Sequence, residues 1–301
     1  MVGADLRPCG PYSLALSARG ASDATRTFRD GILNTAVPGG RGVAWQRPDG
    51  VVCLRATSEQ AFEEVRFCLG IDDDHTPFVL RFQRDPLIGT TIRRLRGLRP
   101  LRLATVAHSL LRALCGQLIL ASEARAMERR IIRAATQRRD GLSVPPTTAD
   151  LARFSPAELR CLGLHARRGA TLARLTRSVE LERLKSQPTT AVADRLERER
   201  GLGPWSVGVV CLEGLGRFER GLEGDLGLVK LLATMRGRRV EGWETAELLE
   251  PYGEWAGLAS VYLLAGYAKG LLPVAGSVAG KAGDARPEVP GAFGAGGRAA
   301  A

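Results

Sequence analysis

A chain of 301 residues, of which 45% are hydrophobic and 25% charged, carries enough apolar sequence to bury a core, which excludes a wholly disordered protein. Its formal net charge of +11 favours a polyanionic partner, above all nucleic acid, because Lys and Arg that neutralise phosphates release counterions. Most of the basic residues are arginines, and Ala and Gly are abundant, as a GC-rich genome would also produce. Charge alone therefore does not separate a nucleic-acid-binding protein from an ordinary globular one.

Cysteine and histidine usage argues against several kinds of site. The six cysteines are isolated from one another, without a C-x-x-C pair or a secretory leader, which predicts reduced thiols in a cytoplasmic protein. The three histidines, His75, His108 and His165, lie far apart in the sequence. Three separated histidines give little support for a histidine-based metal site or a Ser-His-Asp triad, and we expect no metal.

The N-terminal region shows a strand-like pattern. Residues 12–16 alternate between apolar and polar side chains. Apolar residues 43–45 and 51–54 flank residues 47–50, whose sequence Arg-Pro-Asp-Gly is typical of a hairpin turn. We expect a small antiparallel sheet.

A helix is predicted directly after this sheet. Thr57 and Gln60 form a capping-box pattern, and apolar side chains then recur at helical spacing until Gly70. Because only one face of this helix is apolar, we expect it to cover the sheet.

From about residue 95 the pattern becomes helical, with Gly and Pro between the segments. Ser155, Pro156 and Glu158 combine an N-cap, a proline at the first helical position and a glutamate that reaches back to the cap. The apolar run 256–275 is interrupted by Lys269 and Pro273, so it predicts a buried helix rather than a membrane span.

These patterns predict an α+β fold in three parts. Residues 1–95 form an N-terminal domain with an antiparallel sheet and a covering helix, and residues 96–273 form an all-α domain. Residues 274–301 are rich in Gly, Ala and Pro with few large apolar side chains, which is typical of a disordered tail.

Residues 189–232 hold the most informative pattern: a helix, a tight turn and a second helix. Gly201 and Gly203 enclose the aliphatic Leu202 in the turn. Glycines let the backbone turn sharply and leave the amides of the next helix open to a DNA phosphate, while the leucine anchors the turn. A Gly-Leu-Gly sequence can also simply link two packed helices, so its context decides.

About twenty residues further on, Asp225 follows Gly224 and precedes an apolar helical run. This places it as an N-cap, a position that aspartate takes in proteins of every kind. Asp225 alone therefore does not indicate catalysis.

The combination resembles the helix-hairpin-helix superfamily of base-excision DNA glycosylases, in which a Gly-aliphatic-Gly hairpin precedes a Gly/Pro-rich loop that ends in the catalytic Asp. Residues 110–118 are similar to the helix end that carries a Gln in this family, and the resemblance extends over about 95–272. The N-terminal sheet is similar to the two-part architecture of DNA-3-methyladenine glycosylase II.

The resemblance implies roles for individual residues. Asp225 would be the catalytic carboxylate, stabilising the positive sugar and orienting water. Trp205 stands where bifunctional relatives carry a nucleophilic Lys, so water is the expected nucleophile and no strand cleavage should follow. Leu118, after Gln117, would be the wedge that fills the gap left by a flipped base.

The base pocket is less well defined by the resemblance. Trp205 and Tyr262 are its expected aromatic residues, and an electron-rich indole suits a cationic alkylated purine. Val209 and Leu264 depart from the family pattern, because they stand where aromatic residues are expected.

The resulting hypothesis is a monofunctional glycosylase that excises damaged bases, foremost alkylated purines such as 3-methyladenine, by hydrolysing the N-glycosidic bond. A glycosylase for an oxidised or deaminated base, or a non-catalytic helix-hairpin-helix DNA-binding protein, would share the same motifs. A structural α+β protein in which Asp225 only caps a helix would bind no duplex DNA.

The resemblance also implies partners and cofactors. Double-stranded DNA with damaged bases is the expected partner, and the protein is expected to be monomeric, cytoplasmic and associated with the nucleoid. The clustered cysteines of the iron-sulfur members are missing. No cofactor is implied beyond a monovalent cation that backbone carbonyls of the hairpin could hold.

Overall fold

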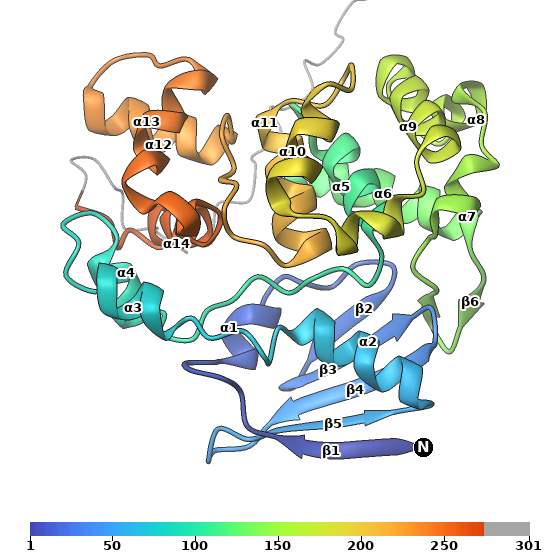
Figure 1. Ribbon diagram of the computed structural model, residues 1–301, viewed down its shortest axis with the longest axis horizontal. Helices are drawn as coiled ribbons and strands as arrows, with labels where there is room; N and C mark the ends of the chain where they lie inside the picture. The colour runs from blue at the N-terminus through green and yellow to red at the C-terminus, as the bar shows by residue number, and fades with distance from the viewer. Residues whose placement is uncertain (274–301) are drawn as a thin grey trace, which may run out of the picture.

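The computed structural model describes residues 1–273; the predicted tail 274–301 lies outside the described residues. A five-stranded antiparallel sheet lies near the N-terminus, and mostly helices follow it (Figure 1). The elements are β1 (Val2–Leu6), α1 (Leu14–Ala18), β2 (Arg26–Arg29), β3 (Ile32–Val37), β4 (Gly40–Gln46), β5 (Val52–Ala56), α2 (Glu59–Leu69), α3 (Thr76–Phe82), α4 (Gly89–Arg94), α5 (Val106–Gly116), α6 (Ala121–Ala135), β6 (Arg138–Arg139), β7 (Leu142–Ser143), α7 (Thr148–Ala152), α8 (Pro156–Cys161), α9 (Ala166–Ser178), η1 (Leu181–Ser186), α10 (Thr189–Glu197), α11 (Pro204–Val209), the π-helical η2 (Val210–Leu215), α12 (Leu226–Arg236), η3 (Gly242–Glu244), α13 (Thr245–Leu249), η4 (Glu250–Trp255) and α14 (Ala256–Ala268).

The sheet has the strand order β1-β5-β4-β3-β2. β4 and β5 form the predicted hairpin around residues 47–50, with Ala44 opposite Leu54. α2 covers the sheet as predicted, and Val65 contacts β4 at Gly42, where a Cβ would lie 2.7 Å from a Val65 methyl group. This glycine therefore lets the helix approach the strand closely.

Two local predictions in this region are wrong. Residues 12–16 are not a strand, because Ser13 caps the short helix α1 instead, with its side chain accepting a hydrogen bond from Leu16 N. The N-cap of α2 is Ser58 rather than Thr57, and its hydroxyl accepts from Ala61 N. Thr57 instead follows the last residue of β5, and its Oγ1 accepts from Arg41 N of the neighbouring strand β4.

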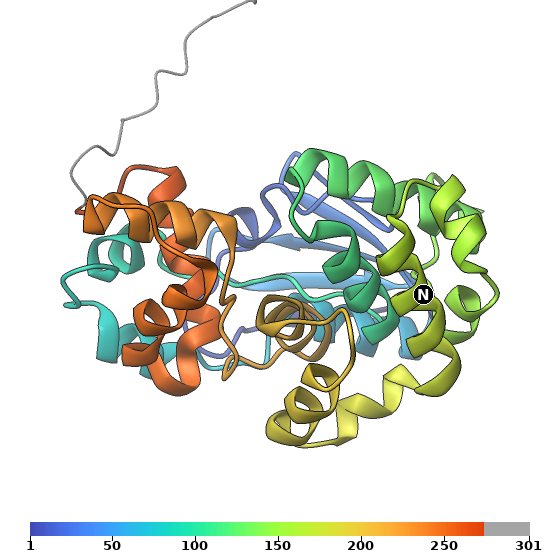
Figure 2. The ribbon, with the colours of Figure 1, turned by 90° about the horizontal axis from the view of Figure 1, so that it is seen from above.

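The helices form two groups above the sheet, which lie side by side when seen from above (Figure 2). One group contains α3, α4 and α12–α14, and the other contains α5–α11. A single hydrophobic core runs through both groups, whereas the sheet, α1 and α2 enclose a second one. The domain boundary at 95/96 stays a prediction, and the two cores divide the chain earlier, since α3 and α4 pack with the later helices.

The part of the chain after residue 95 is not entirely helical, which corrects the predicted all-α domain. β6 and β7 form a two-stranded hairpin. Asp140 and Gly141, at its turn, have φ angles of +46° and +87°, the left-handed pair that a tight hairpin turn needs. The Asp-Gly sequence was the signal for this turn.

The apolar segment near the end of the described chain is α14, and most of its side chains are buried in the helical core. This confirms the predicted core helix. Within residues 1–273, none of the helices combines the length and the apolar character that crossing a bilayer requires.

Candidate active site

The predicted hairpin lies between α10 and α11. Gly201 has a φ of +95°, and a Cβ there would lie 2.5 Å from Thr171 Oγ1, so both conformation and packing require glycine. Leu202 is buried and anchors the turn. Gly203 caps α11, and nothing in the protein would obstruct a side chain on it. Open space at Gly203 is what a ligand that approaches the backbone would need.

Asp225 is the N-cap of α12, and two donors hold its carboxylate. Gly227 N donates to Oδ1 at 2.7 Å, as the capping prediction requires, and Trp205 Nε1 donates to Oδ2 at 3.0 Å. Gly224, with a φ of +80°, turns the chain into the cap, and its N–H donates to Thr245 Oγ1. The half-buried carboxylate therefore has a fixed orientation.

Trp205 joins three parts of the site. It lies in the first turn of α11, directly after the hairpin. A Cβ on Gly116, the last residue of α5, would lie 2.7 Å from its indole, so the ring packs on the end of that helix. Together with the bond to Asp225, this contact brings α5, the hairpin and the start of α12 together.

Gln117 and Leu118 follow α5 and have different environments. Gln117 Nε2 donates to Gly201 O at 2.9 Å and to Ser206 Oγ at 3.0 Å, which ties this loop to the hairpin. Leu118 has a φ of +53° and is 81% exposed. A leucine in the left-handed region with its side chain in solvent is doubly unfavourable, which indicates a functional constraint.

A cavity of about 510 Å³ brings most of the predicted site residues together. Gln117, Leu118 and Gly203 line it with Trp205 and Asp225. Val209 lines it as well, so one departure from the family pattern falls in the cavity wall. Most of the remaining lining residues come from α5, α6, η2 and α12, among them Arg112, Arg125, Glu128, Glu213 and Lys230, and Leu120, directly before α6, lines it too.

Tyr262 is not part of this cavity, which corrects its predicted place in the base pocket. Its side chain is buried in the helical core, and the hydroxyl donates to Leu98 O at 3.1 Å. The ring packs against Phe78 with 5.3 Å between the ring centroids. An aromatic residue on an apolar helix is equally consistent with a core position, and sequence spacing does not distinguish the two.

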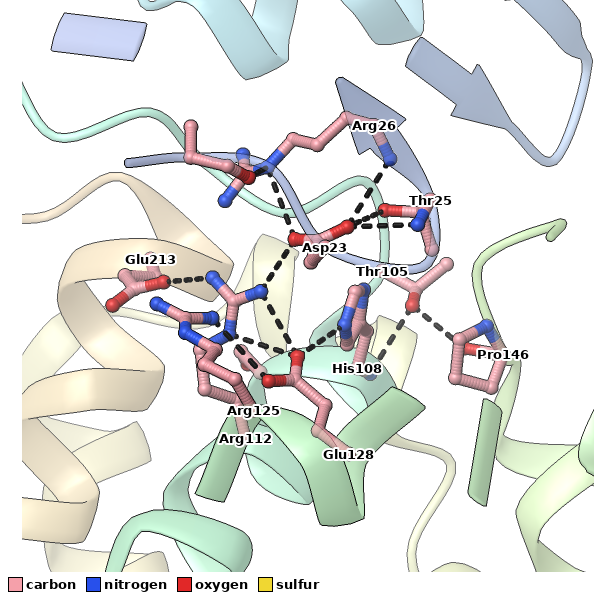
Figure 3. A network of polar contacts seen from close by, with 12 residues as sticks. Asp23, Thr25, Arg26, Thr105, His108, Arg112, Arg125, Glu128, Pro146 and Glu213 are labelled. Atoms are coloured by element: carbon pink, nitrogen blue, oxygen red, sulfur yellow. Dashed lines mark hydrogen bonds and ion pairs between the residues drawn. The ribbon is translucent and has the colours of Figure 1, made fainter. Parts of the chain in front are cut away.

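A buried ionic network that the sequence patterns did not predict reaches the cavity (Figure 3). Arg112 donates to Glu128 Oε1 at 2.9 Å, to Glu213 Oε2 at 2.6 Å and to Asp23 Oδ2 at 2.6 Å. Burial alone would raise the pKa of Glu128, but the Arg112 guanidinium, with His108, lowers it to about 2. The signal was an arginine within the apolar sequence of α5.

Asp23, His108 and Glu128 offer ligand atoms within 4.8 Å of one another, a spacing that metal sites also have. Arg26 and Arg112, however, already pair with these carboxylates. Arg26 and Arg112 share Asp23 Oδ2, and Arg112 also pairs with Glu128 Oε1. Guanidinium charge at these oxygens would repel a cation, so the set fits an ion-pair network better than a metal.

A second cavity, of about 730 Å³, lies beside the hairpin and is also lined by Gln117 and Leu118. Leu118 therefore borders both cavities. The second one is basic, with four arginines in its lining: Arg167, Arg168, Arg174 and Arg200.

Solved structures share the overall fold of this chain. The 3-methyladenine DNA-glycosylase from Archaeoglobus fulgidus superposes with a TM-score of 0.75 at 17% identity, covering 89% of this chain and 98% of that one. The Clostridium acetobutylicum 8-oxoguanine glycosylase/lyase, in complex with DNA, superposes with a TM-score of 0.73 at 15% identity, covering 90% and 98%. The chain has the fold of the helix-hairpin-helix DNA glycosylases.

Sequence comparison is consistent with this glycosylase fold. The DNA-3-methyladenine glycosylase of Bacillus subtilis (strain 168) is 26% identical over 217 residues, which cover 68% of this chain and 71% of the relative. No protein-family model matches the chain.

Proposed function

We propose that the protein is a monofunctional DNA glycosylase of base excision repair that hydrolyses the N-glycosidic bond of damaged bases. The observation that carries this proposal is the position of Asp225, oriented by Trp205 at the wall of a cavity that Leu118 also borders. The glycosylase names of the Bacillus and Archaeoglobus relatives support it. The catalytic, wedge and hairpin roles of the individual residues are part of the proposal.

The mechanism follows from this geometry. A base within a duplex is out of reach, so the nucleotide rotates into the cavity while exposed Leu118 fills the gap. As the bond to the base breaks, positive charge develops on the sugar, and the Asp225 carboxylate stabilises it. Water then attacks the sugar and leaves an abasic site.

The proposed substrate class is an alkylated purine such as 3-methyladenine. Two of the relatives are named for 3-methyladenine. Trp205 presents an indole in the cavity, and an electron-rich ring attracts the positive charge of an alkylated purine.

The proposed partner is double-stranded DNA, bound by a monomer. Arg167, Arg168 and Arg200 beside the hairpin would neutralise phosphates, and the net charge of +11 has the matching sign. A monovalent cation at the hairpin carbonyls and a cytoplasmic, nucleoid-associated location belong to the same proposal.

Lys230 favours one alternative, a glycosylase for oxidised bases that also cleaves the strand. This exposed lysine of α12 lines the cavity, and an amine there could attack the sugar. The Clostridium relative is named a glycosylase/lyase. Against this, Lys230 lies outside the hairpin helix, where the resemblance places the nucleophile of bifunctional members.

The test is to incubate the protein with methylated duplex DNA and with duplexes that carry 8-oxoguanine, uracil or hypoxanthine. Released bases are measured, and strand breaks are counted before alkali treatment. Release of methylated purines without breaks supports the proposal. Breaks that disappear in Lys230→Gln, with a borohydride-trapped adduct in the wild type, would establish the lyase instead; tight binding without any release would indicate a non-catalytic reader.

A further inference from the structure

The cavity holds carboxylates that base hydrolysis as described does not use. Besides Asp225, Glu128 and Glu213 line it. Both oxygens of Asp225 accept hydrogen bonds, and both oxygens of Glu128 are paired, with Arg112 and His108 on one and Arg125 on the other. Among the described residues, Glu213 alone of the three keeps an oxygen, Oε1, without a partner.

The Glu213 carboxylate is held in place although one oxygen is free. Its Oε2 accepts from Arg112, which is fixed in turn by Asp23 and Glu128 (Figure 3). Its backbone lies in the π-helix η2, and its carbonyl accepts from Leu103 N at 2.7 Å. The Glu213 side chain is 24% exposed, so Oε1 is an oriented acceptor that a ligand in the cavity can reach.

The neighbouring glycine explains why the carboxylate can sit beside α5. A Cβ on Gly214 would lie 2.2 Å from Ser109 Oγ, so only glycine lets η2 approach this helix. This close approach brings Glu213 within hydrogen-bond distance of Arg112, one turn further along α5. The position of Glu213 is therefore built into the packing of two helices.

We propose that Glu213 reads the edge of the flipped base and favours guanine-type over adenine-type alkylated purines, an inference that rests on the proposed function. A carboxylate only accepts hydrogen bonds. Guanine presents two adjacent donors, N1–H and the 2-amino group, whereas adenine presents its 6-amino donor beside the acceptor N1, which repels a carboxylate. Arg125 lines the same cavity and supplies a donor that suits the guanine O6.

Glu213→Gln tests this selectivity. Arg112 only donates, so it holds the amide oxygen of the variant and leaves the amide NH2 where Oε1 lies in the wild type. That NH2 can donate to the acceptor N1 of adenine, whereas it meets the N1–H and 2-amino donors of guanine and loses the bonds to them. With methylated duplex DNA, we expect release of 7-methylguanine to fall about tenfold and release of 3-methyladenine to change by less than about threefold. Glu254→Gln removes a charge from an exposed ion pair with Arg81 and is the matched control, with an unchanged ratio of the two bases.

The outcomes separate this inference from the proposed function. A Glu213→Gln ratio equal to that of the wild type, or shifted towards 7-methylguanine, overturns the role of Glu213 while excision itself stands. No release of any base by the wild type overturns the proposed function.

A second measurement needs no variant, in case Glu213→Gln does not fold. Free 7-methylguanine should inhibit the wild-type enzyme at a concentration at least about fivefold lower than 1,7-dimethylguanine, which lacks the N1–H. Equal inhibition by the two bases, or none by either, overturns the inference.

Discussion

The indole N–H of Trp205 donates a hydrogen bond to Asp225 Oδ2, so a residue from the hairpin helix orients a carboxylate twenty positions later in the chain. Trp205→Phe should keep the aromatic ring against Gly116 but remove this donor. We expect single-turnover excision to slow by about tenfold, since one hydrogen bond to a charged group contributes about 1.5 kcal/mol or more. Affinity for abasic-site DNA should stay unchanged, and a rate equal to the wild type would show that the bond does not matter for catalysis.

The backbone conformation of Leu118 should lower the stability of the fold, whereas its side chain serves as the proposed wedge. Its φ of +53° is strained for leucine and normal for glycine. We expect Leu118→Gly to leave the free energy of unfolding unchanged or raise it by up to about 1 kcal/mol, while excision falls at least about tenfold through loss of the wedge. Urea unfolding and a single-turnover assay measure the two effects.

The control for the stability effect is Leu120→Gly. Leu120 is 67% exposed but has an ordinary φ of −64°. Its replacement should lower stability slightly, because glycine gains entropy in the unfolded chain. Full excision activity of Leu118→Gly would contradict the proposed role of the Leu118 side chain as a wedge.

Arg112 should be the most important charged residue for stability. Arg112→Met removes the cation that Asp23 and Glu128 share in the buried network, which should destabilise the fold by about 3–5 kcal/mol in urea unfolding. Arg239→Met, which removes an exposed pair with Glu241 at 3.8 Å, should cost less than about 1 kcal/mol. Similar losses for the two variants would mean that the network adds no stability.

The same network predicts a pH dependence. The pKa of Glu128 is lowered from 4.5 to about 2, so its contribution to stability is present above pH 4.5 and is lost as the pH falls towards 2. Glu128→Gln lacks this titration. The difference in free energy of unfolding between wild type and Glu128→Gln should therefore be largest near pH 7 and shrink below about pH 4. A difference that is constant from pH 7 to pH 3 would show that Glu128 titrates normally.

The arginines beside the hairpin should set the salt dependence of DNA binding. Arg167→Gln is expected to weaken binding to damaged and undamaged duplexes equally and to reduce the slope of log K against log salt by about 0.9. The control is Arg239→Gln, which should leave the slope unchanged. Arg239 is exposed and lies 3.8 Å from Glu241. An unaltered slope in Arg167→Gln would show that Arg167 does not contact a DNA phosphate.

Local patterns predicted the parts of the fold that short-range physics determines. The hairpin around residues 47–50, the cap at Ser155 and the N-cap role of Asp225 all depend on neighbours within a few positions, and the structure confirms them. The strand at 12–16 was wrong because five residues with alternating character do not separate a strand from one helical turn.

The ionic part of the cavity could not be predicted in the same way. Arg112 lies 89 positions from Asp23 and 101 positions from Glu213, and the three meet only through the packing of the segment before β2, α5 and η2. Tyr262 was predicted in the base pocket from its position in the sequence, but its side chain is buried in the helical core. Its hydroxyl partner, Leu98 O, lies 164 positions away.

The role of Asp225 is tested by single-turnover release of 3-methyladenine from methylated duplex DNA by the wild type, Asp225→Asn and Asp194→Asn. Asparagine caps helices as well as aspartate does, so Asp225→Asn should fold and bind abasic-site DNA like the wild type. We predict that its release rate falls at least about a hundredfold, because it loses the charge that stabilises the sugar cation. Asp194, which is exposed on α10, is the matched control and should give the wild-type rate. Undiminished release by Asp225→Asn would contradict the central claim that this carboxylate drives base excision.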